Sequence, residues 1–160
     1  MYFDIVLAAS GSGDATVRFW DLTTETPHFE CKGHPGWVLA LAWAPNDSKL
    51  ASGDKSGKVI VWDPKTGKQI GCTMTRHTKF ITALAWEPLH LNGSCRRLAS
   101  ASNDGSVIIW DTVLGKSDSF LSIKSLRTFT SLFLYLTNCQ RENVHRKPTK
   151  QFPYFAGQLV

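Results

Sequence analysis

Residues 97–111, RLASASNDGSVIIWD, hold serines and an aspartate, and His77 lies upstream of them. These are the residue types of a hydrolytic triad, in which a serine attacks, a histidine takes its proton and an aspartate orients the histidine. The Gly-x-Ser-x-Gly elbow that exposes many serine nucleophiles is absent from the chain. An enzyme has one nucleophile, so the interpretation depends on whether this stretch is unique.

The stretch is one of three copies. Residues 9–21, 51–63 and 99–111 align without gaps, each with a small-residue segment, a polar turn and an alternating apolar segment that ends in Trp-Asp. Upstream of the second and third copies, residues 33–45 and 76–88 also align without gaps. The Trp-Asp endings recur about every 40 to 50 residues, a period typical of four-stranded β units.

With Gly33–His34, the variant Arg76–His77 and three Trp-Asp endings, the chain resembles the WD-repeat family. The resemblance implies an all-β fold in which each repeat forms one blade of a β-propeller. The expected innermost strands are 37–44 and 80–86, and the second strands are 49–53 and 97–101. The third strands are 58–62 and 106–110, and the outermost strands lie near 27–31 and 69–73. About two and a half blades of a larger, unclosed propeller are predicted: 1–32 (partial), 33–75 and 76–123, followed by an irregular basic tail at 124–160 that we expect to be poorly ordered.

The resemblance also assigns the polar residues a structural role. In this family a histidine before the blade, a serine or threonine, an aspartate in a turn and the tryptophan form a hydrogen-bonded chain. Carried over by position, the third copy supplies His77, Ser100, Asp104 and Trp110; the second supplies His34, Ser52 and Trp62, with Ser56 where aspartate is expected; the first supplies Ser10, Asp14 and Trp20 without a histidine. Ser102 is an alternative to Ser100. Since the set recurs, we expect no catalytic residue.

Other candidate sites are weak. Trp37 and Phe80 occupy matching positions at the start of the innermost strands, where partner contact and ordinary packing are both open. The four cysteines include no Cys-x-x-Cys pair and the remaining histidines lack ligand spacing, so no metal, cofactor or small-molecule site is predicted.

Charge is unevenly distributed along the chain. Residues 1–111 contain equal numbers of basic and acidic residues, so the whole net charge of +5 comes from residues 112–160. A basic nucleic-acid-binding face on the repeats is therefore not predicted, and RENVHRKPTK is interpreted as a solvated tail rather than an RNA-binding arm. No apolar run is long enough for a membrane span.

Within the WD-repeat family, residues 7 to 112 resemble the Notchless-type proteins. The motifs are DATVRFWDLTTETPHF, GHPGWVLALAWAP, WDPKTGKQIG and the WEPLHLN insertion before CRRLASASNDGSVIIWDT. The resemblance implies a non-catalytic scaffold in large (60S) ribosomal subunit biogenesis, in the nucleus and nucleolus, with protein partners from the pre-60S particle and rRNA contact left open. Without this resemblance, a cytoplasmic location is expected. The alternatives are a signalling adaptor of the Notch pathway and an inactive truncated isoform.

Two departures from the Notchless pattern shape these expectations. That family has an N-terminal ubiquitin-like domain that engages the ATPase Midasin; because none is found here, a Midasin contact is not expected. After residue 112 the Gly-His and Trp-Asp pattern stops, which indicates a fragment or truncated isoform. An unclosed array exposes apolar blade faces, so we expect weak stability, aggregation or dependence on a partner.

Overall fold

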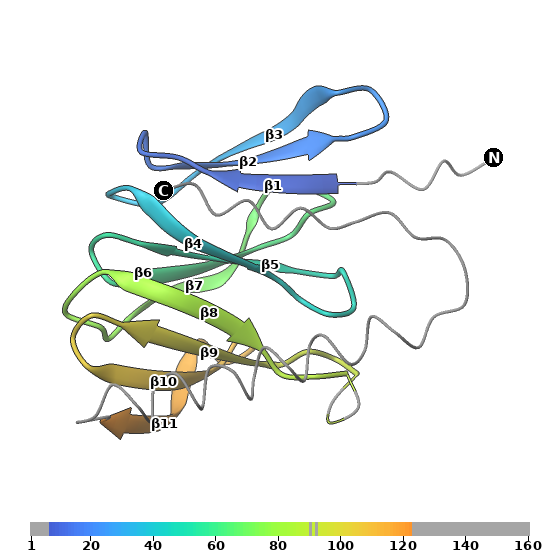
Figure 1. The fold of residues 1–160 in the computed structure, drawn as a ribbon. Helices are drawn as coiled ribbons and strands as arrows, with labels where there is room; N and C mark the ends of the chain where they lie inside the picture. The colour runs from blue at the N-terminus through green and yellow to red at the C-terminus, as the bar shows by residue number, and fades with distance from the viewer. Residues whose placement is uncertain (1–6, 90, 92, 123–160) are drawn as a thin grey trace.

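The computed structural model describes residues 7–89, 91 and 93–122, which form eleven β-strands and no helix. The strands build three antiparallel sheets in chain order (Figure 1). The first contains β1 (Leu7–Gly11), β2 (Thr16–Asp21) and β3 (Thr26–Lys32). The second contains β4 (Val38–Trp43), β5 (Leu50–Asp54), β6 (Lys58–Trp62) and β7 (Gln69–Thr75). The third contains β8 (Ile81–Trp86), β9 (Arg97–Ser102), β10 (Ser106–Asp111) and β11 (Lys116–Ser122).

The three sheets stack face to face without closing into a ring in the part of the chain that the structure describes (Figure 1). β4 of the second sheet packs against β1 on one side and against β8 on the other. This arrangement confirms the predicted fold class, a set of propeller blades that is not closed. The blade boundaries stay predictions, and the tail at 124–160 lies outside the described residues.

Local sequence explains the strands and their turns. The β-branched residues of KVIVW and SVIIW suit a pleated strand that is covered on both faces. The last turn residue before each of these strands is Gly57 or Gly105, with φ of 84° and 81°, where glycine has no steric penalty. Ala15 occupies the same position in the first sheet with φ of 67°, an uncommon conformation for a residue with a Cβ.

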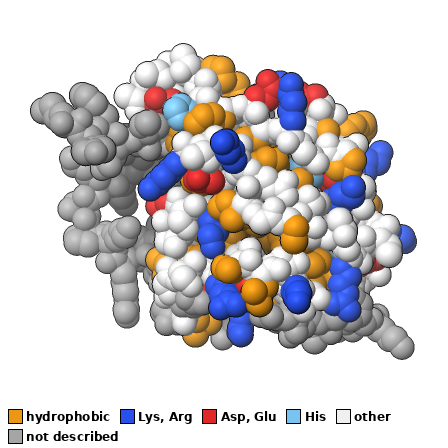
Figure 2. Space-filling view, turned by 180° about the vertical axis from the view of Figure 1, so that it is seen from behind, with side chains coloured by type: hydrophobic (Ala, Val, Ile, Leu, Met, Phe, Trp, Pro, Cys, Tyr) orange, Lys and Arg blue, Asp and Glu red, His pale blue; other side chains and the backbone are white. Residues whose placement is uncertain are grey.

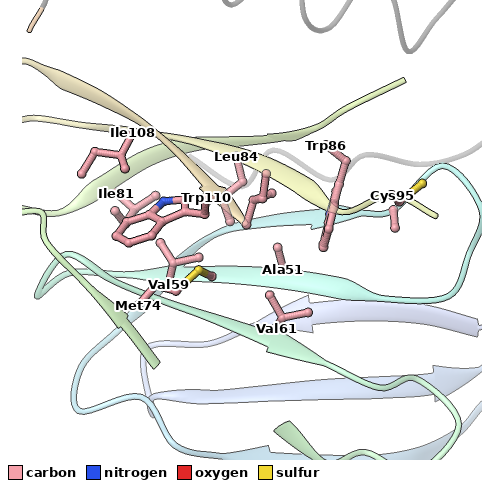
Figure 3. Close-up of a cluster of buried hydrophobic side chains, with 12 residues drawn as sticks. Ala51, Val59, Val61, Met74, Ile81, Leu84, Trp86, Cys95, Ile108 and Trp110 are labelled. Atoms are coloured by element: carbon pink, nitrogen blue, oxygen red, sulfur yellow. The ribbon is translucent and has the colours of Figure 1, made fainter. Parts of the chain in front are cut away.

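Two apolar clusters fill the spaces between the sheets. Side chains of the first and second sheets form one: Val17, Phe19, Cys31, Val38, Leu50, Ile60 and Trp62. The second and third sheets form the other, which includes Ala51, Val59, Val61, Met74, Ile81, Leu84, Trp86, Leu98, Ile108 and Trp110. Figure 3 shows Trp110 and Ile81 on the side of this cluster that carries Val59 and Met74. Each sheet therefore buries its apolar side chains against the next sheet.

The close approach of the second and third sheets yields a test of this packing. A Cβ added at Gly53 would lie 2.6 Å from Cγ2 of Ile81, so Gly53→Ala overpacks the interface. We expect a loss of about 1–3 kcal/mol in the free energy of unfolding, measured by urea denaturation followed by circular dichroism. Gly13→Ala is the matched control, because nothing lies within 4 Å of the added Cβ. Equal effects of the two substitutions would contradict the packing.

Candidate functional site

The third sheet contains a buried chain of four polar side chains. Trp110 on β10 donates its Nε1–H to Ser100 Oγ at 2.7 Å, and Ser100 Oγ lies 2.7 Å from His77 Nε2. His77 Nδ1 lies 3.0 Å from Asp104 Oδ2 in the turn between β9 and β10. An ionised carboxylate only accepts, so Nδ1 of His77 carries a proton and donates to Asp104. The structure thus brings together all four residues predicted for this copy.

The second sheet contains an equivalent chain with its carboxylate in a different place. Trp62 Nε1–H donates to Ser52 Oγ at 2.7 Å, and His34 Nε2 lies 2.6 Å from the same oxygen. His34 Nδ1 is 2.9 Å from Asp54 Oδ2, and both of these side chains are fully buried. Ser56, at the position aligned with the expected aspartate, instead donates its hydroxyl to Asp54 Oδ1. Sequence alignment missed Asp54 because it stands two residues before that position.

The first sheet has only part of the chain. Trp20 Nε1–H donates to Ser10 Oγ at 2.8 Å, but both side chains are accessible to solvent. Asp14 does not join them: it accepts from Thr16 Oγ1 and forms an ion pair with Arg18 at 3.0 Å. The structure therefore brings two of the three predicted residues together in this copy.

Two further serines in the third sheet have distinct roles. Ser102, the alternative to Ser100, donates to the carbonyl oxygens of Lys79 and Phe80 rather than joining the chain. Ser106 lies 3.0 Å from His77 Nδ1 and donates to the Asp104 carboxylate. Ser106 is not among the residues predicted from the sequence; the feature that marks it there is its place directly after the turn glycine, Gly105.

The carboxylates are held ionised. Burial tends to raise the pKa of Asp104, but hydrogen bonds from Ser106 and the backbone N–H of Thr78 outweigh it and lower the pKa to about 2. For Asp54, burial likewise tends to raise the pKa, and the N–H of Lys58 and the hydroxyl of Ser56 outweigh it and lower the pKa. Both carboxylates are therefore permanent acceptors for their histidines at neutral pH.

His34 is kept neutral in the fold. Burial lowers its pKa, and the opposing attraction of the Asp54 carboxylate does not cancel this effect. A neutral ring can accept from Ser52 and donate to Asp54 at the same time, whereas a protonated ring cannot accept. The hydrogen-bonded chain of the second sheet therefore has a single arrangement of donors and acceptors.

The triad-like geometry does not make these serines accessible to a substrate. Ser100 is 1 % exposed and its oxygen already accepts the indole N–H of Trp110. Ser52 is fully buried and bonded in the same way to Trp62. A nucleophile must reach the substrate it attacks, so both hydroxyls fit an internal structural role.

Trp37 directly precedes β4 and Phe80 directly precedes β8, two strands that pack against each other. The two aromatic side chains are 54 % and 39 % exposed. The Lys55 ammonium lies 4.4 Å from the centroid of the Trp37 ring, and the carbonyl of Phe80 accepts from the N–H of Asn103 at 3.0 Å. The backbone of each aromatic residue is thus fixed by the hairpin turn of its own sheet, while the ring faces solvent.

Residues 7–122, except for residues 90 and 92, contain neither a cluster of metal-ligating side chains nor a membrane-spanning helix. No group of three or more His, Cys, Asp or Glu side chains in these residues is placed to hold a metal ion. None of the described segments forms a helix long and apolar enough to cross a membrane. Basic and hydrophobic side chains are interspersed on the face shown in Figure 2.

The repeated sheets and their Trp-Ser-His-Asp chains define a class of protein. The family model "WD domain, G-beta repeat" matches residues 25–63 and 68–111, and the chain belongs to this WD40 family. A crystal structure of the computationally designed Ika8 protein has a TM-score of 0.64 with 29 % identity, covering 76 % of this chain and 35 % of the designed one.

Particular WD-repeat proteins are also similar to this chain. Protein Notchless of Drosophila melanogaster is 59 % identical over 56 % of this chain and 18 % of its own length. The Notchless protein homolog of Arabidopsis thaliana is 54 % identical over 56 % of this chain and 19 % of its own. Ribosome assembly protein 4 of Saccharomyces cerevisiae is 47 % identical over 51 % of this chain and 16 % of its own length. These comparisons confirm the predicted resemblance, and the matches span less than a fifth of each of these relatives.

Removal of Ser100 tests the hydrogen-bonded chain. Ser100→Ala leaves the indole of Trp110 and the imidazole of His77 buried without their shared partner, so we expect a loss of about 2 kcal/mol in unfolding free energy. Ser10→Ala is the control: it breaks the matching bond to Trp20 where water can replace it, and should cost less than about 0.5 kcal/mol. Urea denaturation measures both. Equal costs would contradict the role of burial.

Acid should weaken the fold in two stages. Because the folded pKa of His34 is lowered, its contribution is complete above the unfolded value of about 6.5 and is lost as pH falls below it. The lowered pKa of Asp104 adds a second loss below about pH 4, as pH falls toward the folded value. Urea unfolding at pH 7.5, 5.5 and 3.5 measures both stages. In His34→Asn the loss of unfolding free energy between pH 7.5 and 5.5 should be smaller. An unchanged dependence of stability on pH would contradict the assignment of this stage to His34.

Proposed function

We propose that this chain is a non-catalytic WD-repeat scaffold that acts in assembly of the large ribosomal subunit. The observation that carries the proposal is its similarity to two Notchless proteins and to ribosome assembly protein 4 of yeast. Of these relatives, the yeast protein is the one named for ribosome assembly. The proposal extends that name from proteins of which this chain matches only a small part.

The geometry of the sheets supports a scaffold rather than an enzyme. In this proposal the residues of the two complete polar chains stabilise the blades internally, and the blades are residues 33–75 and 76–123 with a partial blade before them. The serine hydroxyls of the two complete chains are buried, so recognition falls to the exposed loops between strands. Loops held by a rigid scaffold are a common place for binding residues.

Trp37 and Phe80 are the proposed partner-contact residues. Aromatic side chains are enriched among the residues that contribute most to protein interfaces. Each follows a loop that its own blade fixes, so binding would require little ordering of backbone. We assign their partners to the protein components of the pre-60S particle, and the chain accordingly to the nucleus and nucleolus.

Sedimentation tests this function. The tagged full chain, expressed in cells, should migrate with pre-60S particles on a sucrose gradient. Trp37→Ala should shift a substantial part of it to free fractions, whereas Leu22→Ala should not, although Leu22 is also 54 % exposed. Recovery of the chain only in free fractions with signalling proteins would favour the adaptor alternative, and its recovery alone would favour an inactive isoform.

A further inference from the structure

Two exposed aromatic residues and two exposed lysines lie on adjoining segments, and we call them the rim patch: Trp37, Lys55, Lys79 and Phe80. The backbone N–H of Lys55 donates to the carbonyl of Trp37 at 2.9 Å, and the Lys55 ammonium covers one face of the indole. A Cβ added at Gly57 would lie 2.7 Å from the carbonyl oxygen of Lys79. The hairpin turn that carries Lys55 therefore lies directly against the loop that carries Lys79 and Phe80.

The two lysines of the rim patch are not neutralised by the ion pairs found in the described part of the chain. The acidic residues of the neighbouring turns are engaged elsewhere. Asp54 pairs with His34, and Asp104 with His77. Asp14, in the first hairpin turn, pairs with Arg18. The rim patch therefore combines apolar rings with positive charge that is available to a partner.

We propose that the rim patch binds an acidic protein segment that also carries apolar side chains. A carboxylate of this segment would pair with the Lys55 ammonium. Because the ammonium already contacts the Trp37 ring, the lysine is held in place before binding. A second carboxylate pairs with Lys79, and an apolar side chain packs on Phe80. This inference rests on the proposed scaffold function and specifies the chemistry of its partner.

The same charges fit a nucleic acid less well. Binding to a phosphate backbone depends on several basic contacts and on aromatic rings that are free to stack on bases. The rim patch contains two lysines and no arginine, and Lys55 occupies one face of its tryptophan. The repeats as a whole, residues 1–111, have as many acidic as basic residues.

Fluorescence anisotropy with a labelled peptide, Glu-Glu-Leu-Gly-Glu-Glu-Phe-Gly, tests the inference on the full chain. We expect saturable binding that weakens as salt is added. Replacing both lysines, Lys55→Gln with Lys79→Gln, should weaken binding about fivefold, because exposed charge pairs contribute modestly. Phe80→Ala should weaken it about tenfold, because the apolar side chain of the peptide packs on this exposed ring. Melting curves of the variants should match that of the parent chain.

The control is Lys65→Gln, since Lys65 is an exposed lysine in the turn at the opposite end of β6. It should leave the affinity unchanged, and a peptide with lysine in place of glutamate should not bind. Tighter binding of an oligouridine of equal length, or peptide binding that is insensitive to the double lysine variant, would overturn the inference.

The two proposals fail in different ways. Absence of peptide binding by a chain that still migrates with pre-60S particles would overturn the acidic partner and leave the scaffold function standing. Peptide binding by a chain that stays in free fractions would overturn the ribosomal role and support the chemistry of the rim patch.

Discussion

A buried indole N–H, hydroxyl and imidazole must each have a hydrogen-bond partner, and this requirement determines how the second and third blades are built. The bonds from tryptophan to serine to histidine to aspartate connect two strands, the loop before the blade and a hairpin turn. Every donor faces an acceptor along the chain. Loss of one group leaves its neighbours unsatisfied in a low-dielectric interior, so the four residues act as one unit.

The same tryptophans also join neighbouring blades. Trp62 donates to Ser52 within its own blade and packs in the cluster that contains Phe19 of the first sheet. Trp110 does the same between its own blade and the second. Trp20 has the equivalent bond, but it is in neither described cluster, and its bond is open to solvent. Polar order inside a blade is therefore coupled to apolar contact between blades.

The repeat pattern predicted most of the fold, because strand alternation and Trp-Asp endings recur at fixed positions. It did not predict that Asp54 bonds His34, because alignment of the repeats places Ser56 at the aspartate position. Whether a carboxylate contacts the histidine nitrogen depends on side-chain geometry, which alignment does not give. Asp14 has the expected position, but without a histidine it pairs with Arg18. β11 was also not predicted, since Lys116–Ser122 lacks apolar alternation and is defined by its pairing with β10.

The polar chains lie inside the second and third blades, whereas the proposed partner contacts lie on exposed loops, so stability and the proposed recognition use different residues. Hydrogen exchange of the indole N–H groups, followed by NMR, tests the division most directly. The buried Trp62 and Trp110 indoles should exchange slowly, because opening them requires disruption of a blade, while the accessible Trp20 indole should exchange quickly. Exchange of all three at the same rate would contradict the account.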